Sequence, residues 1–500
     1  IPVVGNAPAA GSRVSATLEQ VIARGLPPLV SAVSELDPNS LQQPDGRIDL
    51  DRIRAARAPA ARANRVMASA RDELAILPTS HIAGLDARLS AVRTELGHLA
   101  DGTDALARAT QALPPMLGQD GRRRYLVAME NPAESRGTGG LLGAFGVVSA
   151  DSGRLRLLRT GPNSDLQDEK RLPVDLGPDY RALWGSDPAI WRNSNLSPHL
   201  PYASRIWLAL WKHQFHERLD GVITIDPVAL GYLLGPAGKL RGPDGSTVTG
   251  HNAARVIMHD SYERYPSPRQ NRQRDQFLLA VGRKVADRLL HGVSNPSAMG
   301  QALVRAVDER RLGVYSAHPD EEHDLSGTAI AQQVPVTKGP YLSVVVNNGG
   351  ANKLDYYLRR RVTYRLDQCT PLGRNSHIGI WLTNAAPAIG LPEYVVGKPL
   401  RTDAGVRLPP GSNRLLVYVY ATHGARFSGA TLDSRPLTVQ QVQERGHPVY
   451  VFAVDLRPGQ TAEGRLDLVE PASTRTPPVV ITQPLVRNQE TTLSAQPCTS

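Results

Sequence analysis

The sequence predicts a multidomain α+β protein, with a helical (coiled-coil) stalk at residues 1–117, a central α/β domain at residues 119–330 and a β-sandwich at residues 334–500. Three observations predict this order. Apolar residues recur at helical spacing in the first part, strand and helix patterns alternate in the second, and alternating strand patterns with Pro-Gly turns fill the third. A chain of 500 residues also suits about three domains.

Two apolar seams predict a helical hairpin in the stalk. The first consists of Ile53, Ala56, Ala60, Ala63, Met67, Ala70 and Leu74; the second consists of Leu85, Leu89, Val92, Leu96, Leu99, Leu106 and Leu113, with Thr103 and Thr110 at the remaining heptad positions. Small residues of one seam admit large residues of the other, and Leu77–Ser80 is short enough to make the helices antiparallel. Pro59 should kink the first helix or delay its start, and an earlier helix should break at Pro27-Pro28. These patterns indicate a stalk or an oligomerisation hairpin.

The segment Arg123–Gly140 is the most informative part of the chain. It predicts a buried strand, Tyr125–Met129, that leads into a polar loop with Asn131, Glu134 and Arg136. An amide, a carboxylate and a guanidinium at the end of a strand could hold an anion or a metal–anion pair. The alternative is a loop that is held by an internal salt bridge between Glu134 and Arg136.

Other elements of the central domain have local signals. Asp151–Gly153 predicts a tight turn into a strand at Arg154–Thr160. The buried strand Val222–Ile225 ends at Asp226, which is a natural N-cap because Pro227 follows it at the first helical position. Helices are expected at Tyr202–His216, Pro227–Leu234, Asn252–Tyr262 and Arg274–His291.

A second candidate segment precedes the last of these helices. It runs from Tyr262 to Asp275 and carries four arginines: Arg264, Arg269, Arg272 and Arg274. Guanidinium groups form paired hydrogen bonds with phosphate oxygens, and a helix N-terminus adds its own partial positive charge. The segment could therefore hold a pyrophosphate, although the sequence has no Walker or dinucleotide-binding motif. A solvated basic loop is the alternative.

The C-terminal part predicts a strand with one apolar and one basic face. Tyr356, Leu358, Val362, Tyr364 and Leu366 alternate with Tyr357, Arg359, Arg361, Thr363 and Arg365. The basic face could bind an anionic glycan, or it could simply be solvated. Later strands at Leu415–Tyr420 and Val449–Leu456 indicate a sandwich of immunoglobulin type.

Charge and cysteine content narrow the partners and the compartment. The formal charge of +10 and the isoelectric point near 9.7 favour anionic partners. Nucleic acid is disfavoured, because only 5% of residues are aromatic and no zinc-finger spacing or RNA-binding aromatic motif occurs. The two cysteines, Cys369 and Cys498, fit one disulfide in an oxidising compartment; two unrelated free thiols are the alternative.

The sequence contains no run of eighteen or more apolar residues and no signal peptide. Its abrupt start at Ile1-Pro2 suggests that an N-terminal anchor has been removed. We therefore expect an extracytoplasmic protein that is anchored to the cell membrane or associated with the cell wall.

Several of these motifs together resemble a known family. Tyr125–Gly140, Leu219–Pro227, Thr249–Ala253 and Arg272–Lys284 are similar to an uncharacterised family of actinobacterial envelope proteins, and Asn352–Tyr357 extends the similarity beyond the central domain. More distantly, the same order of motifs resembles the LytR-CpsA-Psr phosphotransferases. The loop Asn131–Arg136 departs from those enzymes, because their Ser-Ile-Pro-Arg-Asp type of sequence is absent.

The resemblance implies a central α-β-α sandwich of LytR-CpsA-Psr type on a membrane-anchored stalk. It also implies transfer of a glycan phosphate from a polyprenyl-pyrophosphate carrier to a cell-wall acceptor, assisted by magnesium (Mg²⁺). Arg136, Arg272 and Arg274 would clamp the pyrophosphate, and Glu134 or Asp275 would hold Mg²⁺ or orient the acceptor. The expected catalytic residues are Glu134, Arg136 and Asp275, and the expected substrate-binding residues are Asn131, Arg264, Arg269, Arg272 and Arg274.

Two functions follow from these observations. The first is an extracytoplasmic enzyme that transfers or hydrolyses a phosphate-linked or lipid-linked cell-wall glycan. The second is a non-catalytic protein that binds the wall glycan or acts as a scaffold, with homo-oligomers formed through the stalk. The position of the Glu134–Arg136 segment separates them, because an enzyme needs these side chains in an open pocket shared with Arg272.

Overall fold

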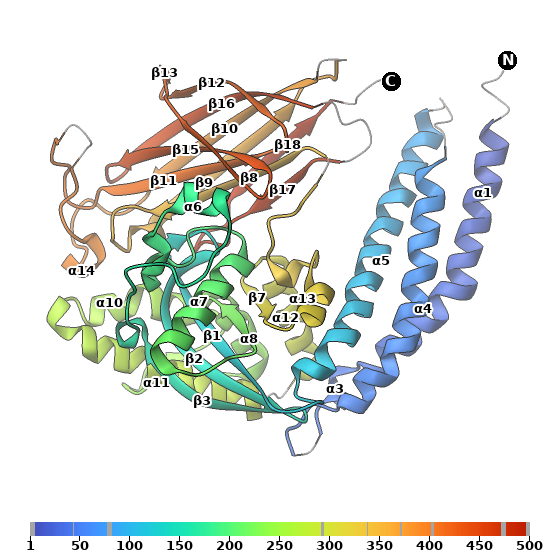
Figure 1. The fold of residues 1–500 in the computed structure, drawn as a ribbon, viewed down its shortest axis with the longest axis horizontal. Helices are drawn as coiled ribbons and strands as arrows, with labels where there is room; N and C mark the ends of the chain where they lie inside the picture. The colour runs from blue at the N-terminus through green and yellow to red at the C-terminus, as the bar shows by residue number, and fades with distance from the viewer. Residues whose placement is uncertain are drawn as a thin grey trace.

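The computed structural model describes residues 6–43, 45–77, 83–291, 295–337, 339–370, 373–401, 405–471 and 477–496. Figure 1 shows an elongated bundle of helices (blue), a central mixed domain (teal, green and yellow) and a C-terminal domain of strands (orange and red). The central domain lies against the strand domain on one side, and the lower end of the helical bundle joins it on the other. The chain is therefore a multidomain α+β protein, as predicted.

The stalk consists of α1 (Asn6–Gln20), the π-helix η1 (Val21–Gly25), α2 (Leu26–Glu35), α3 (Pro38–Leu41), α4 (Leu50–Ala75) and α5 (Ala83–Met116). All seven residues of the seam predicted on α4 are buried. On α5, Leu89, Leu96, Thr103 and Thr110 of the predicted seam are buried, but Leu99 is 42% and Leu113 is 39% exposed. The seam is therefore confirmed at every seventh residue and wrong at Leu99 and Leu113, where Ala100 and Ala112 are buried instead.

Prolines change the stalk less than the sequence predicts. Pro59 lies buried inside α4, which begins at Leu50, so the predicted delay of this helix is wrong. Pro27 and Pro28 occupy the first turn of α2, where a missing N–H costs nothing, and the irregularity lies just before them in η1. The turn predicted at residues 77–80 falls mostly outside the described residues. No helix within the described ranges has both the length and the apolarity to cross a bilayer.

The central sheet has the order β3-β2-β1-β4-β7. Its strands are β1 (Arg123–Arg136), β2 (Gly139–Asp151), β3 (Arg154–Pro162), β4 (Gly221–Ile225) and β7 (Leu312–Ser316). β1 and β4 are parallel, and the other neighbours are antiparallel. The tight turn predicted at Asp151–Gly153 is confirmed, because Ser152 (φ 50°) and Gly153 (φ 80°) both adopt left-handed conformations between β2 and β3.

Helices cover both faces of this sheet. The longer ones are α6 (Pro178–Trp184), α7 (Leu200–Phe215), α8 (Pro227–Ala237), α11 (Asn271–His291), α12 (Pro296–Asp308) and α13 (Pro319–Leu325). Three short elements follow one another without a break and form one helical segment: α9 (Ala253–Arg255), the π-helix η5 (Val256–Asp260) and α10 (Ser261–Arg264). Leu126 and Ala128 of β1 pack in one core with α7, whereas Val127 and Met129 pack in another with α8 and α12. The alternation along β1 therefore builds a layer of helices on each side.

The N-cap predicted at the end of β4 is confirmed. The Asp226 carboxylate accepts a hydrogen bond of 2.7 Å from the backbone N–H of Ala229, in the first turn of α8. It also forms a buried ion pair of 2.6 Å with Arg311. Asp226 is therefore a structural residue.

The C-terminal domain packs two sheets face to face. The first has the order β13-β12-β16-β10-β9-β18 and the second β14-β15-β11-β8-β17. The strands are β8 (Tyr341–Asn348), β9 (Leu358–Leu366), β10 (Arg374–Asn384), β11 (Asn413–Ala421), β12 (Arg426–Leu432), β13 (Arg435–Pro436), β14 (Gln440–Glu444), β15 (His447–Leu456), β16 (Thr461–Glu470), β17 (Val479–Thr482) and β18 (Glu490–Ala495). One apolar core contains residues from both sheets.

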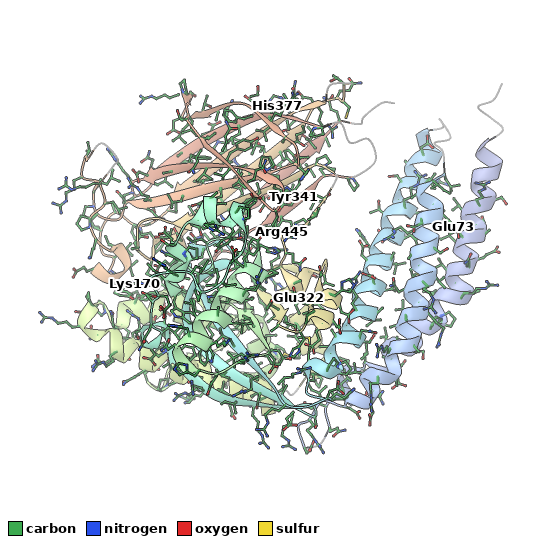
Figure 2. All side chains as sticks on the ribbon, viewed as in Figure 1. Glu73, Lys170, Glu322, Tyr341, His377 and Arg445 are labelled. Carbon is green, nitrogen blue, oxygen red and sulfur yellow. The ribbon has the colours of Figure 1, made fainter. Side chains whose placement is uncertain are left out.

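The sandwich is not an independent lobe. All eight residues of β8 are buried, because Leu342 and Val344 face the core of the sandwich while Tyr341 and Val345 face the core of the central domain. Figure 2 shows Tyr341 between the two domains. The Trp184 indole of α6 also donates a hydrogen bond of 2.8 Å to Glu444 of β14. The two domains therefore share a continuous core.

The C-terminal strand supports the predicted disulfide between Cys369 and Cys498. β18 runs parallel to β9, and the backbone N–H of Gln496 donates to the carbonyl of Leu366 at 3.0 Å. Cys369 is disulfide-bonded, and Cys498 lies outside the described residues, so the pairing stays a prediction. We expect a non-reducing peptide map to yield one linked pair of peptides that contains both cysteines. Unlinked, alkylatable thiols at both positions would contradict it.

Candidate functional site

The predicted polar loop after Met129 is wrong, because β1 continues through it to Arg136. Residues 123–136 pair with β2 as a long hairpin, with irregularities in register after Met129 and after Asn131. The hairpin end is enclosed on several sides: a Cβ at Gly140 would come within 2.2 Å of the backbone of Asn131, and one at Gly137 would come within 2.2 Å of the backbone of Leu196. The side chains that the sequence placed in an open loop therefore lie inside the protein.

Glu134 is an internal ion-pair partner. Its carboxylate is 7% exposed and contacts the ammonium of Lys353, which lies 219 residues later and is 13% exposed. Burial by itself would lower the pKa of Lys353, but the attraction of Glu134 and Tyr262 raises it above its ordinary value. The alternative of a local salt bridge with Arg136 is therefore wrong, since the cation comes from the start of the β-domain.

Arg136 is buried and directs its donors to neutral oxygens. It donates to the carbonyls of Arg192 (2.8 Å), Ser135 (2.9 Å) and Asn348 (3.0 Å), and to the side chain of Asn193 (3.2 Å). Burial lowers the pKa of Arg136, and the nearby charges of Glu134 and Asp355 oppose that shift only in part. These bonds link β1 to the loop before α7 and to β8. Arg136 therefore holds the domains together, and its guanidinium is not presented to a ligand.

The structure brings three predicted residues together at the seam between the two domains. Arg274 is 4% exposed, and its guanidinium lies 4.0 Å from the ring centre of Tyr394 and 5.2 Å from that of Tyr262. Lys353 lies 5.3 Å from the Tyr394 ring, and Asn131 donates to the Tyr262 hydroxyl at 2.8 Å. We call this set the seam cluster: Asn131, Glu134, Tyr262, Arg274, Lys353 and Tyr394.

The remaining arginines of the second candidate segment lie outside this cluster. Arg264, Arg269 and Arg272 are exposed. Arg264 pairs with Asp244 and stacks 5.0 Å from the ring of Phe277. Only Arg274 therefore reaches the interior, so the predicted clamp of Arg136, Arg272 and Arg274 does not form around one opening.

The expected Mg²⁺ does not fit Glu134 and Asp275. A Mg²⁺ site needs several oxygen donors at octahedral positions. The Glu134 carboxylate already faces Lys353, and the Asp275 carboxylate lies 3.4 Å from the Arg274 guanidinium. Burial raises the pKa of Asp275, and Arg274 partly opposes that shift. Each carboxylate is therefore compensated by its own cation.

The sequence missed most of the partners in this seam. Asp355, which is fully buried, accepts from the Ser135 backbone (2.8 Å), from the Ser135 hydroxyl (2.7 Å), from Asn348 (2.8 Å) and from Asn413 (2.6 Å). Burial raises its pKa, and these hydrogen bonds oppose the shift. Lys353 and Asp355 both belong to the run Asn352–Tyr357 that extended the family resemblance, so the sequence did mark these two residues. Nothing in the sequence analysis pointed to Tyr394.

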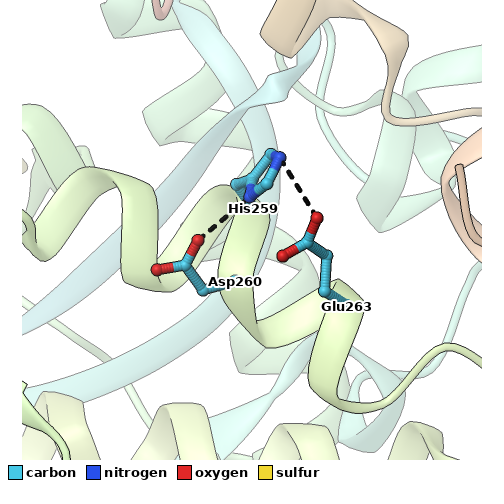
Figure 3. Close-up of side chains that lie close together, drawn as sticks. All are labelled: His259, Asp260 and Glu263. Carbon is cyan, nitrogen blue, oxygen red and sulfur yellow. Dashed lines mark hydrogen bonds and ion pairs between the residues drawn. The ribbon is translucent and has the colours of Figure 1, made fainter. Parts of the chain in front are cut away.

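One group of potential metal ligands lies elsewhere on the central domain. The ligand atoms of His259, Asp260 and Glu263 lie within 4.8 Å of one another. Figure 3 shows the His259 ring between the two carboxylates. The His259 imidazole lies 3.0 Å from Asp260 and 3.7 Å from Glu263, and Arg255 lies 3.4 Å from Asp260. These ligand types suit Zn²⁺ better than Mg²⁺. However, the groups already neutralise one another, and Glu263 is 62% exposed.

The basic face predicted for this strand is confirmed from Leu358 onward, but the predicted start is wrong, because Tyr356 and Tyr357 belong to the 3-10 helix η8 (Leu354–Tyr357). Arg359, Arg361 and Arg365 are exposed, while Leu358, Val362, Tyr364 and Leu366 are buried in the sandwich. Arg361 lies opposite Trp381 of β10, and its guanidinium is 4.1 Å from the indole ring. A Cβ at Gly379 would come within 2.6 Å of the same indole, so the ring lies across this glycine. Trp381 is therefore held flat against the sheet.

Acidic groups complete this outer face. His377 lies 2.6 Å from Asp467 and 3.0 Å from Asp367. Partial burial would lower the pKa of His377, but the two carboxylates raise it. Arg365 lies 3.6 Å from Asp367. Figure 2 places His377 on the part of the sandwich that lies away from the central domain, so this face is open to a large partner.

Comparison with known proteins gives one family. Residues 120–262, from the start of β1 into α10, match the family described as protein of unknown function (DUF4012). No curated protein matches the chain. The match covers the β1–β2 hairpin, β4 and the helical turn that carries Tyr262, and it leaves the stalk and the sandwich outside.

Solved structures that match do so weakly. A putative nutrient binding protein from Legionella pneumophila is 8% identical over 26% of this chain and 43% of its own, with a TM-score of 0.17. An M1 zinc metallopeptidase from Deinococcus radiodurans is 15% identical over 23% of this chain and 21% of its own, with a TM-score of 0.14. The chain thus spans less than half the length of either protein, and likeness at this level carries no argument about fold or function.

Proposed function

We propose that this chain is a non-catalytic, extracytoplasmic envelope protein that binds an anionic, phosphate-linked cell-wall glycan through the outer face of its β-sandwich. The observation that supports this most directly is the row of exposed arginines on β9, beside the flat indole of Trp381. The formal charge of +10 and the resemblance to envelope proteins agree with an anionic wall polymer as the partner.

The chemistry of this face suits a charged sugar chain. Sugar rings pack their C–H faces on flat aromatic rings, and guanidinium groups make bidentate hydrogen bonds with phosphate or carboxylate oxygens. Arg359 and Arg361 lie opposite Thr383 and Trp381 on the neighbouring strand, so cations and the indole share one surface. A rigid sheet presents these groups without a loss of backbone conformational entropy on binding.

Catalysis at the β1–β2 hairpin has weaker support. A LytR-CpsA-Psr type of transfer would need Arg136 and Arg274 to reach the same pyrophosphate. Arg136 instead donates to four oxygens of the protein, and Arg274 lies between two tyrosine rings. The same residues account well for a rigid seam between the domains. We therefore regard the seam cluster as structural and the sheet face as the binding site.

Charge reversal on β9 tests the proposal. We expect the triple variant Arg359→Glu/Arg361→Glu/Arg365→Glu to lose at least tenfold in affinity for purified anionic wall polymer, measured by co-sedimentation of the full chain at physiological salt. A few tenths to 1 kcal/mol for each exposed contact, together with new repulsion, gives about this size.

A matched control changes the net charge equally at a distance from the sheet. Arg171, Arg218 and Arg288 are exposed residues of the central domain, and reversing these three should change retention less than twofold. Equal losses for the two triple variants would show that only net charge matters. Unchanged retention of the β9 variant would place the binding elsewhere. Trp381→Ala should weaken retention without any change of charge.

A further inference from the structure

A second basic feature lies between the stalk and the central domain, on a different side of the molecule from the sandwich. It is an open groove of about 790 Å³. Its lining comes from two consecutive helices of the stalk and from α13, which is distant in sequence: Arg54, Arg57, Ala58, Ala61, Arg62, Asn64 and Arg65 of α4, Asp104, Ala107, Arg108 and Gln111 of α5, and His323 and Asp324 of α13. Figure 1 shows α13 beside the lower half of α5.

The groove exists because small residues form part of its lining. Ala58, Ala61 and Ala107 leave space between the longer side chains of α4 and α5. A hydrogen bond to the central domain holds α13 against the stalk and so closes the groove on its third side. Arg108 donates to the carbonyl of Ser326, just after α13, at 3.3 Å. The volume lies within the ~300–1,000 Å³ range of ligand-binding sites.

The lining carries five arginines against two aspartates. Asp104 is already engaged, because it accepts from Arg108 at 2.7 Å and from Asn64 at 3.1 Å. Arg62 and Arg65, in contrast, are exposed, and no ion pair or hydrogen bond of theirs occurs within the described part of the chain. The groove therefore concentrates positive charge that the protein itself does not neutralise.

We propose that this groove binds a linear chain of phosphate groups, as a second contact that is distinct from the glycan face of the sandwich. Arg62 and Arg65 lie on the same side of α4 as Arg54, which itself pairs with Asp51 at the rim. The span from Arg54 to Arg65 is about 16 Å at 1.5 Å per residue. Such a row can follow successive phosphates of an extended polymer, because each guanidinium offers a planar fork of donors. The flat surface of a bilayer does not fit into a concave groove between helices, which favours a free polymer over lipid headgroups.

Titration of the full chain with linear tripolyphosphate, measured by calorimetry at several salt concentrations, tests this proposal. We expect Arg62→Glu/Arg65→Glu to lower the affinity at least tenfold and to reduce its dependence on salt. Arg62→Gln/Arg65→Gln should lower it by a smaller factor. The matched control is Arg13→Glu/Arg24→Glu, which reverses two exposed arginines elsewhere on the stalk, and it should change the affinity less than twofold.

Three results would overturn the proposal. One is an equal loss for the two glutamate pairs, which would mean that net charge alone binds the probe. Another is unchanged affinity in the Arg62/Arg65 variants when circular dichroism shows that they are folded. The last is that the Arg62 and Arg65 substitutions weaken binding to phosphatidylglycerol vesicles more than binding to tripolyphosphate. That result would make lipid headgroups the ligand.

Discussion

Replacing Lys353 with methionine should lower the free energy of unfolding by about 3–5 kcal/mol, because it leaves the carboxylate of Glu134 buried without its cation. Glu134 is 7% exposed and Lys353 is 13% exposed, so water can replace little of the lost interaction. Methionine keeps most of the length of the lysine side chain, so that the effect reports charge more than volume. Equilibrium denaturation with urea, analysed for the midpoint and the slope, would measure the change.

A double-mutant cycle separates the pair from the rest of the seam. Glu134→Gln in the Lys353→Met background removes the unpaired charge and should restore more than half of the lost stability. The control is Arg465→Met, which breaks an exposed ion pair of 2.6 Å with Glu463 and should cost less than about 1 kcal/mol. A cost for Lys353→Met as small as that of the control would show that the seam cluster does not stabilise the fold.

Glu130→Gln should flatten the dependence of stability on pH. Glu130 is buried at the base of the β1–β2 hairpin, where it accepts from Asn195 at 3.1 Å and from the hydroxyl of Thr138. Burial raises the pKa of Glu130 from 4.5 to about 8, although these hydrogen bonds oppose the shift. The folded protein therefore keeps this carboxyl protonated at neutral pH, whereas the unfolded chain releases the proton.

The sign follows from the raised pKa. The contribution of the protonated Glu130 to the free energy of unfolding is fully present below the pKa of this group in the unfolded chain. It is lost as the pH rises toward the folded pKa of about 8. The wild-type protein should lose about 1.4 kcal/mol per pH unit from this group between pH 6 and 7, and about half of that slope near pH 8. Glu130→Gln removes that slope, since an amide does not titrate in this range.

Urea denaturation at several values of pH from 6 to 9 would measure the two slopes. Glu322, with a pKa raised to about 7 mainly by burial, adds a similar dependence over a lower range and is shared by both proteins. The exposed Glu490 supplies the control, because Glu490→Gln should leave the slope unchanged. Parallel curves for the wild type and Glu130→Gln would mean that Glu130 is ionised in the folded protein.

Several features were predicted well because they depend on a few neighbouring residues. The small residues on α4 recur at helical spacing, which fixes their side of the helix wherever it docks. Asp151–Gly153 can form a tight turn from its own backbone preferences, and Asp226 caps α8 through a contact three residues away. Arg359, Arg361 and Arg365 occupy alternate positions of β9, and that period fixes them to the outer face, whereas Arg360 lies on the buried face.

The candidate site was predicted less well because its environment is not local. Asn131, Glu134 and Arg274 were identified by residue type, and the structure does bring them into one cluster. Their exposure was predicted wrongly, since a polar sequence after a strand indicates a loop unless distant groups neutralise it. At the buried end of this strand, Lys353 of the next domain pairs with Glu134, and Asp355 accepts from Ser135.

The sequence by itself therefore determined the type of the longer helices and of several strands, the inner side of α4, and the chemical character of the outer sheet face. Only the tertiary structure decided which charged residues are buried and which remain free to bind. The reason is physical: periodicity is set by backbone geometry within a few residues, whereas burial of a charge is tolerated only where a partner compensates it. For Glu134 that partner lies 219 residues away, whereas Arg62 and Arg65 have none within the described chain and face an open groove.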